Sequence, residues 1–176
     1  MSYDIHCYRS RIGKPDVAEA QETMEADDSI IESGQQVKLD IAKALTDFNP
    51  KLEVFKFDYN EIAKLQNLSV DEAKDQYNYI ELNPPDGDLA IQITVFNNNV
   101  SLTVPYWYKD NDARQVFQKL MDYLKIIRKT SGYFAYDPQT DQAFDPLTTD
   151  INGLKLYINT TGQVENLPTK PWWKFW

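Results

Sequence analysis

The chain has one histidine and one cysteine, His6 and Cys7, and they are adjacent. A histidine beside a cysteine can activate the thiol as a nucleophile, and both residue types bind zinc. However, apolar and polar residues alternate from Tyr3 to Tyr8, which predicts a strand. Neighbouring side chains of a strand point to opposite faces, so this pair is not expected to form a dyad or share a metal ion. We predict no catalytic residue and no metal ligand here.

Three carboxylates, Asp137, Asp141 and Asp145, are spaced by four around Pro138. Carboxylate oxygens are the ligands that hard cations prefer, so such a cluster could hold one or take part in hydrolysis. The other interpretation is that Asp137 and Asp141 only cap the turn, because Asp bonds its own backbone and Pro presets φ. We prefer the turn interpretation and predict no metal.

Aromatic residues form a second candidate site, with Tyr106, Trp107 and Tyr108 following a strand and Tyr133 and Tyr136 following a helix. They could line a ligand groove at one end of the sheet. Aromatic residues at strand ends also bury large areas in ordinary packing, which is the simpler interpretation. Together with the three carboxylates, the groove defines an alternative function as a small-ligand-binding domain or hydrolase.

No nucleotide-binding motif is present, because the glycines stand at 13, 34, 87, 132, 153 and 162, too far apart for a phosphate loop. The hydrolase and metalloprotease motifs G-x-S-x-G and H-E-x-x-H are also absent. We therefore predict no cofactor.

The segment from Leu89 to Asp145 is predicted to form the folding core. Two alternating strands flank Asn97 to Asn99, and Asn tolerates the left-handed backbone of a tight turn. A helix with one apolar stripe is predicted from Asp112 to Thr130, with acidic residues capping its start and Gly132 just past its end. A second short hairpin then surrounds the turn at Pro138.

Further elements are predicted along the chain. They are an opening strand at Tyr3 to Tyr8, helices at Val17 to Asp27 and Gln36 to Phe48, short helices after Asp58 and Ser69, and strands at Leu52 to Phe57, Tyr77 to Leu82 and Gly153 to Ile158. Residues 1–166 are thus predicted to form one α+β domain. Its antiparallel, meander-rich sheet has five to seven strands, with helices on at least one face.

The chain is acidic, with 27 Asp and Glu against 18 Lys and Arg and a net charge of −9. This charge argues against a nucleic-acid surface, and no basic cluster is visible. Acidic residues gather between Lys14 and Lys38, where Glu19, Glu22 and Glu25 have no basic neighbour in the sequence. This run is either a solvated face or a surface for a basic protein partner.

Redox chemistry and hydropathy indicate the compartment. A single cysteine excludes an intrachain disulfide, and residues 1–10 lack the apolar run of a signal peptide. No segment approaches the roughly 20 apolar residues that span a bilayer. We expect a cytoplasmic protein without a transmembrane segment.

Residues 167–176 are predicted to form an aromatic and basic tail that includes Trp172, Trp173 and Trp176. Its aromatic residues could pack on the domain, contact a membrane surface weakly, or anchor a docking peptide in a partner. We expect a tail that is separable from the fold, since chain ends are where order is usually lost.

A resemblance is carried by the opening residues Met1-Ser2-Tyr3-Asp4, and by Val104-Pro105-Tyr106-Trp107 followed by an amphipathic helix and the turn Tyr136-Asp137-Pro138-Gln139-Thr140. The chain resembles small uncharacterised bacterial cytosolic proteins that open M-[SA]-Y-D and share the Y-D-P-Q-T turn. Some of these look like immunity proteins, which block a toxin by binding it. The resemblance implies no catalytic residues. We therefore expect a non-catalytic protein-binding module, such as an acidic inhibitor or an immunity-type protein.

Overall fold

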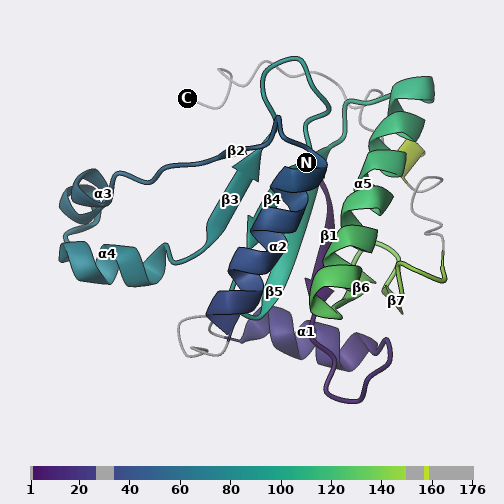
Figure 1. The fold of residues 1–176 in the computed structure, drawn as a ribbon, viewed down its shortest axis with the longest axis horizontal. Helices are drawn as coiled ribbons and strands as arrows, with labels where there is room; N and C mark the ends of the chain where they lie inside the picture. The colour runs from purple at the N-terminus through teal and green to yellow at the C-terminus, as the bar shows by residue number, and fades with distance from the viewer. Residues whose placement is uncertain (1, 27–33, 150–156, 159–176) are drawn as a thin grey trace, which may run out of the picture.

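The computed structural model describes residues 2–26, 34–149 and 157–158, which form an α+β domain around one antiparallel sheet (Figure 1). The strands are β1 (Ser2–Tyr8), β2 (Glu53–Val54), β3 (Ile80–Asn83), β4 (Gln92–Val95), β5 (Asn99–Pro105), β6 (Phe134–Asp137) and β7 (Gln142–Phe144). The helices are α1 (Val17–Glu25), α2 (Gln35–Phe48), α3 (Tyr59–Gln66), α4 (Val70–Gln76) and α5 (Asp110–Ser131). The predicted fold class and number of strands are confirmed.

The sheet has the order β2-β3-β4-β5-β1-β6-β7, so the opening strand lies inside it, between β5 and β6. Strands β3, β4 and β5 form the predicted meander, and β6 and β7 form the predicted second hairpin. Ile5 on β1 pairs with Leu102 on β5, and both are fully buried. The alternating pattern therefore sets the register, because a slip by one residue would turn these side chains out of the core.

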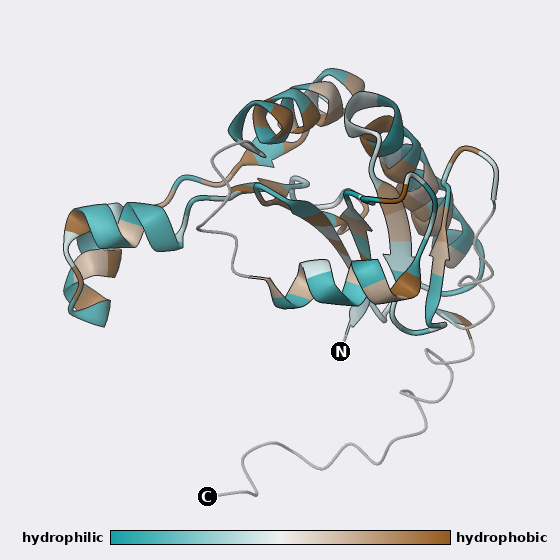
Figure 2. Ribbon diagram, turned by 90° about the horizontal axis from the view of Figure 1, so that it is seen from below, coloured by the Kyte–Doolittle hydropathy of each residue, from teal (hydrophilic) through white to brown (hydrophobic). Residues whose placement is uncertain are grey.

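Helices α2 and α5 lie side by side over one face of the sheet (Figure 2). The predicted stripe of α5 is buried along its whole length, and Leu120 at its centre has no exposed surface. Gly132 ends this helix in the left-handed conformation, with φ 76°. Ile41 and Leu45 of α2 complete the core.

Helix α1 packs on the opposite face, against β1 and β7. Ala20 is fully buried, and Val17 and Met24 lie against a small cluster that includes Tyr8 and Phe134. The apolar face of α1 is narrow, and the bulky aromatic residues Tyr8 and Phe134 of the sheet complete its packing.

The turn between β4 and β5 differs from its prediction. None of Asn97, Asn98 and Asn99 has a positive φ, and all three are buried. The N-terminus of α2 covers this turn, and a Cβ added to Gly34 would lie 1.8 Å from the carbonyl oxygen of Asn97. Glycine is required at position 34 because backbone meets backbone there, and not because of a positive φ.

Other boundaries also changed. Lys109 precedes α5 without a side-chain cap, and Asp110 has a φ of 44°, so the predicted acidic cap of this helix is wrong. The predicted strand from Leu52 shortens to β2, while β4 begins at Gln92 and not at Leu89. Of the strand predicted at 153–158, Tyr157 and Ile158 are described and are helical, and the rest lies outside the described residues.

Within 2–26, 34–149 and 157–158, no helix combines the length and the apolarity that crossing a bilayer requires.

Candidate functional site

His6 and Cys7 point to opposite faces of the sheet, as predicted. Cys7 is fully buried in the core, and burial raises the pKa of its thiol. His6 lies on the other face, between Ser101 of β5 and Tyr136 of β6. Its Nδ1 atom is buried and has no hydrogen-bond partner within the described part of the chain. These two residues cannot act as a nucleophile and its base.

Asp137 is a structural residue at the end of β6. Its Oδ2 accepts a hydrogen bond from the hydroxyl of Tyr3, and its Oδ1 accepts one from the backbone N–H of Gln139 at 2.9 Å. The carboxylate is 1% exposed. Asp137 therefore fixes the turn after β6 to strand β1, in agreement with the turn interpretation.

Asp141 and Asp145 have other partners. Asp141 accepts a hydrogen bond from the hydroxyl of Tyr136 at 3.0 Å. Asp145 forms a two-pronged ion pair with Arg128, with distances of 3.1 and 3.0 Å, and this hydrogen bonding lowers the pKa of its carboxyl. Among the residues described, no group of three His, Cys, Asp or Glu is arranged to hold a metal ion. The three predicted carboxylates thus stabilise three separate contacts.

The residues of the predicted aromatic groove are mostly packed. Tyr106 stacks on Tyr157 with ring centroids 5.1 Å apart, and both rings contact Tyr3. The hydroxyl of Tyr108 accepts a hydrogen bond from the backbone N–H of Ala90 at 2.6 Å. Trp107 differs, because 64% of its surface is exposed. The simpler interpretation, ring packing at a strand end, describes Tyr106 and Tyr108.

The acidic residues of α1 are partly neutralised by a base that precedes them in the chain. Arg11 forms ion pairs with Glu19, at 3.2 Å, and with Glu22. Arg11 precedes Lys14 and so lies outside the acidic run between Lys14 and Lys38. The run alone therefore did not indicate this pairing. Glu25 is exposed at the end of the helix. Trp172, Trp173 and Trp176 lie outside the described residues.

Residues 55–79, here called the arm, extend away from the rest of the domain (Figures 1 and 2). The arm holds α3 and α4, which pack mainly against each other. Asp58 caps α3, and Ser69 forms the predicted capping box with Glu72 at the start of α4. Asn67 links the helices with a φ of 55°. These local bonds hold two helices that are too short to be stable alone.

Aromatic rings join the arm to the sheet. Phe57 is central, with its ring centroid 5.5 Å from that of Tyr77 and 5.2 Å from that of Tyr79. Tyr79 in turn contacts Phe96, the residue after β4, with ring centroids 5.3 Å apart. Phe55 lies 4.9 Å from Phe57. This chain of rings gives the arm a defined base, because each aromatic pair adds stabilisation beyond its buried area.

The arm exposes its large apolar side chains. Leu65 is 76% exposed, Phe55 50% and Val70 37%, and Ala63 and Ala73 are the buried residues of the two helices. Burying a leucine is worth about 1.5–3 kcal/mol, so leaving Leu65 in water forgoes that gain. The arm is therefore folded, but it contributes little apolar surface to the hydrophobic core.

Comparisons of the chain with protein-family models, with curated proteins and with solved structures find no match. The arm was not identified as a site from the sequence. Its helices were predicted from their caps. The exposure of Leu65 and Phe55 could not be predicted, because it depends on whether another element of the fold covers them, and the neighbouring sequence does not show this.

Proposed function

We propose that this chain is a non-catalytic protein-binding module, and that its arm inserts apolar side chains into a basic protein partner. The observation that carries the proposal is Leu65, which is 76% exposed on an ordered helix with no large buried side chain beneath it. Exposed apolar groups on a projecting, capped element are typical anchors of an interface, because their burial is deferred until a partner is present.

The charge of the arm indicates the chemistry of the partner. Residues 55–79 carry five acidic and three basic side chains, giving a net charge of −2 (five minus three), and the whole chain carries −9. A partner with a basic surface around an apolar pocket would be attracted at long range and would then bury Leu65. The α1 residues Glu19, Glu22 and Glu25 extend the negative field, although Arg11 offsets part of it.

An immunity-type inhibitor is the form of this function that we favour, acting in the cytoplasm of a bacterium. The resemblance of the opening residues and of the turn after α5 supports this form. The single cysteine, buried and free as Cys7, supports a reducing compartment. The alternative of a ligand-binding domain or hydrolase using Asp137, Asp141 and Asp145 is less supported, because each carboxylate has its own structural partner.

Photo-crosslinking in cells tests the proposal. A photoreactive phenylalanine analogue replaces Leu65 in one variant and Leu39, a 52% exposed leucine on α2, in a matched control. We expect the Leu65 variant alone to give a covalent adduct with another protein. The purified partner should bind the unmodified chain, with an association rate that falls as the salt concentration rises.

Two results would contradict the proposal. Adducts of equal yield from the Leu65 and Leu39 variants would show that the crosslinking is nonspecific. An adduct with a second copy of the chain would show that the arm is a dimer contact.

A further inference from the structure

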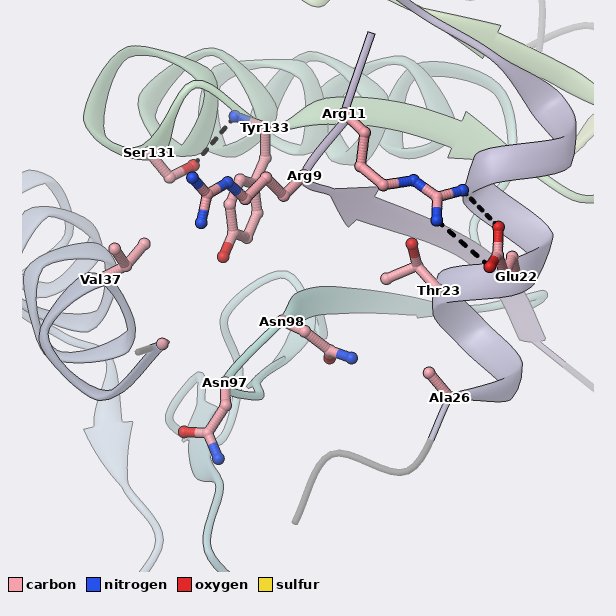
Figure 3. A pocket seen from close by; sticks show the side chains of 11 residues that line it. Arg9, Arg11, Glu22, Thr23, Ala26, Val37, Asn97, Asn98, Ser131 and Tyr133 are labelled. Atoms are coloured by element: carbon pink, nitrogen blue, oxygen red, sulfur yellow. Dashed lines mark hydrogen bonds and ion pairs between the residues drawn. The ribbon is translucent and has the colours of Figure 1, made fainter. Parts of the chain in front are cut away.

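A cavity of about 430 Å³ lies at one end of the sheet (Figure 3). It is bounded by the end of β1, the last turn of α1, the start of α2, the β4–β5 turn and the end of α5. Its polar lining includes Arg9, Asn97, Asn98, Ser131 and Tyr133, and its apolar lining includes Val37. A volume of this size is in the range of small-molecule sites.

Arg9 places a guanidinium in the lining of the cavity (Figure 3). Among the described residues it has no hydrogen bond or ion pair. Arg11, the second guanidinium of the lining, is paired with both Glu22 and Glu19, so these three side chains together carry one negative charge. Arg9 is therefore the lining guanidinium without a carboxylate partner among the described residues, and its planar fork matches a carboxylate.

The walls around Arg9 are preformed. Asn97 and Asn98 are 4% and 8% exposed, and the close approach of Gly34 to the Asn97 backbone holds their turn in place. The hydroxyl of Ser131 is fixed by its bond to the carbonyl of Ile127 at 2.7 Å. The cavity also lies at the start of the 14-residue α2, whose N-cap Gly34 provides no side-chain cap. The positive end of this helix adds to the field of Arg9.

We infer that this cavity binds a small organic monocarboxylate, with the carboxylate on the guanidinium of Arg9. A single guanidinium suits a monocarboxylate better than a phosphate dianion. The amide side chains of Asn97 and Asn98 suit a ligand that carries an amide near its carboxylate, such as a peptide C-terminus or an acylated amino acid. Val37 supplies an apolar wall for the rest of the ligand. This site is separate from the arm and does not depend on the function proposed for it.

Titration with a defined probe, followed by NMR, tests this inference. The probe is N-acetyl-alanyl-alanine as the free acid, with its C-terminal amide and inorganic phosphate as comparison ligands. We expect saturable shifts of the Asn97 and Asn98 side-chain amides with the free acid alone, at up to about 10 mM ligand. Arg9→Gln should weaken binding about tenfold or more, because the carboxylate loses a charge-assisted pair. Arg114→Gln, an exposed arginine on α5, should leave the affinity unchanged.

The inference is overturned if the free acid gives no saturable shifts, if the amide form binds as tightly as the acid, or if Arg9→Gln, shown to be folded by its thermal melt, binds as the parent does. Equal affinity for phosphate would overturn the assignment to a carboxylate. A free acylated alanine that binds as tightly as the dipeptide would identify a metabolite-sized ligand, and tighter binding with each added residue would identify a peptide C-terminus. Both of these results retain the carboxylate on Arg9.

Discussion

The hydroxyl of Tyr3 donates a hydrogen bond to the carboxylate of Asp137, although 134 residues separate them in the sequence. Tyr3 lies on the interior strand β1 and is fully buried, and Asp137 ends the neighbouring strand β6. Burial and the neighbouring carboxylate raise the pKa of Tyr3 far above its usual range, so the hydroxyl remains a donor at all ordinary pH values.

Tyr3→Phe should therefore lower the free energy of unfolding by about 1–3 kcal/mol, because the buried Asp137 loses a donor. Chemical denaturation of both proteins measures this loss. Tyr77→Phe is the matched control, since its hydroxyl accepts an exposed hydrogen bond from Gln66 and its loss should cost within about 0.5 kcal/mol. Equal losses in the two variants would show that the Tyr3 bond is not special.

Leu120→Asp should unfold the domain. The substitution places a carboxylate in the centre of the buried stripe of α5, at a cost of several kcal/mol. Circular dichroism and thermal melts check it, with the exposed Gln115→Asp on the same helix as a control. A melting midpoint within a few degrees of the parent would mean that the stripe is not buried.

The patterned elements were predictable from the sequence, because their information is local. Each of these patterns is made of residues that are close together in the sequence. They are the apolar stripe of α5, the alternation of β1 and β5, and the capping box of α4. The partners of the candidate carboxylates could not be predicted from the sequence. The ion pairs of Asp145 with Arg128 and of Glu22 with Arg11 join residues that only the tertiary structure brings together. Likewise, the cavity around Arg9 combines five elements that no sequence spacing brings together.

Gly34→Ala should lower the free energy of unfolding by about 1–3 kcal/mol, because its methyl group would overlap the backbone of Asn97 and push α2 off the β4–β5 turn. Denaturant melts measure the loss. Gln35→Ala, at the neighbouring exposed position, should be close to neutral. A stable Gly34→Ala protein would contradict the close contact between this helix start and the turn.

His6 should make the protein less stable as the pH falls. Burial lowers the pKa of His6, and the nearby Asp4 raises it by less. The folded state therefore binds a proton less readily than the unfolded chain, whose histidine titrates near about 6.5. The free energy of unfolding therefore decreases as the pH falls below this value. The decrease ends once the pH is below the pKa of His6 in the folded state. His6→Gln should lose less stability than the parent between about pH 7 and pH 5.

NMR titration of His6, the single histidine, reads its pKa directly. A value at or above about 6.5 would contradict the assigned burial of the ring.

The affinity of the crosslinked partner for Leu65→Ala, measured by calorimetry, tests the proposed function most directly. Leu39→Ala on α2 is the control, since both leucines are exposed and lie on helices. We predict that Leu65→Ala weakens binding by about tenfold or more, or about 1.4 kcal/mol, with the melting midpoint unchanged, while Leu39→Ala binds as the parent does. Unchanged affinity of Leu65→Ala, or an equal loss in both variants, would contradict the assignment of the arm as the binding element.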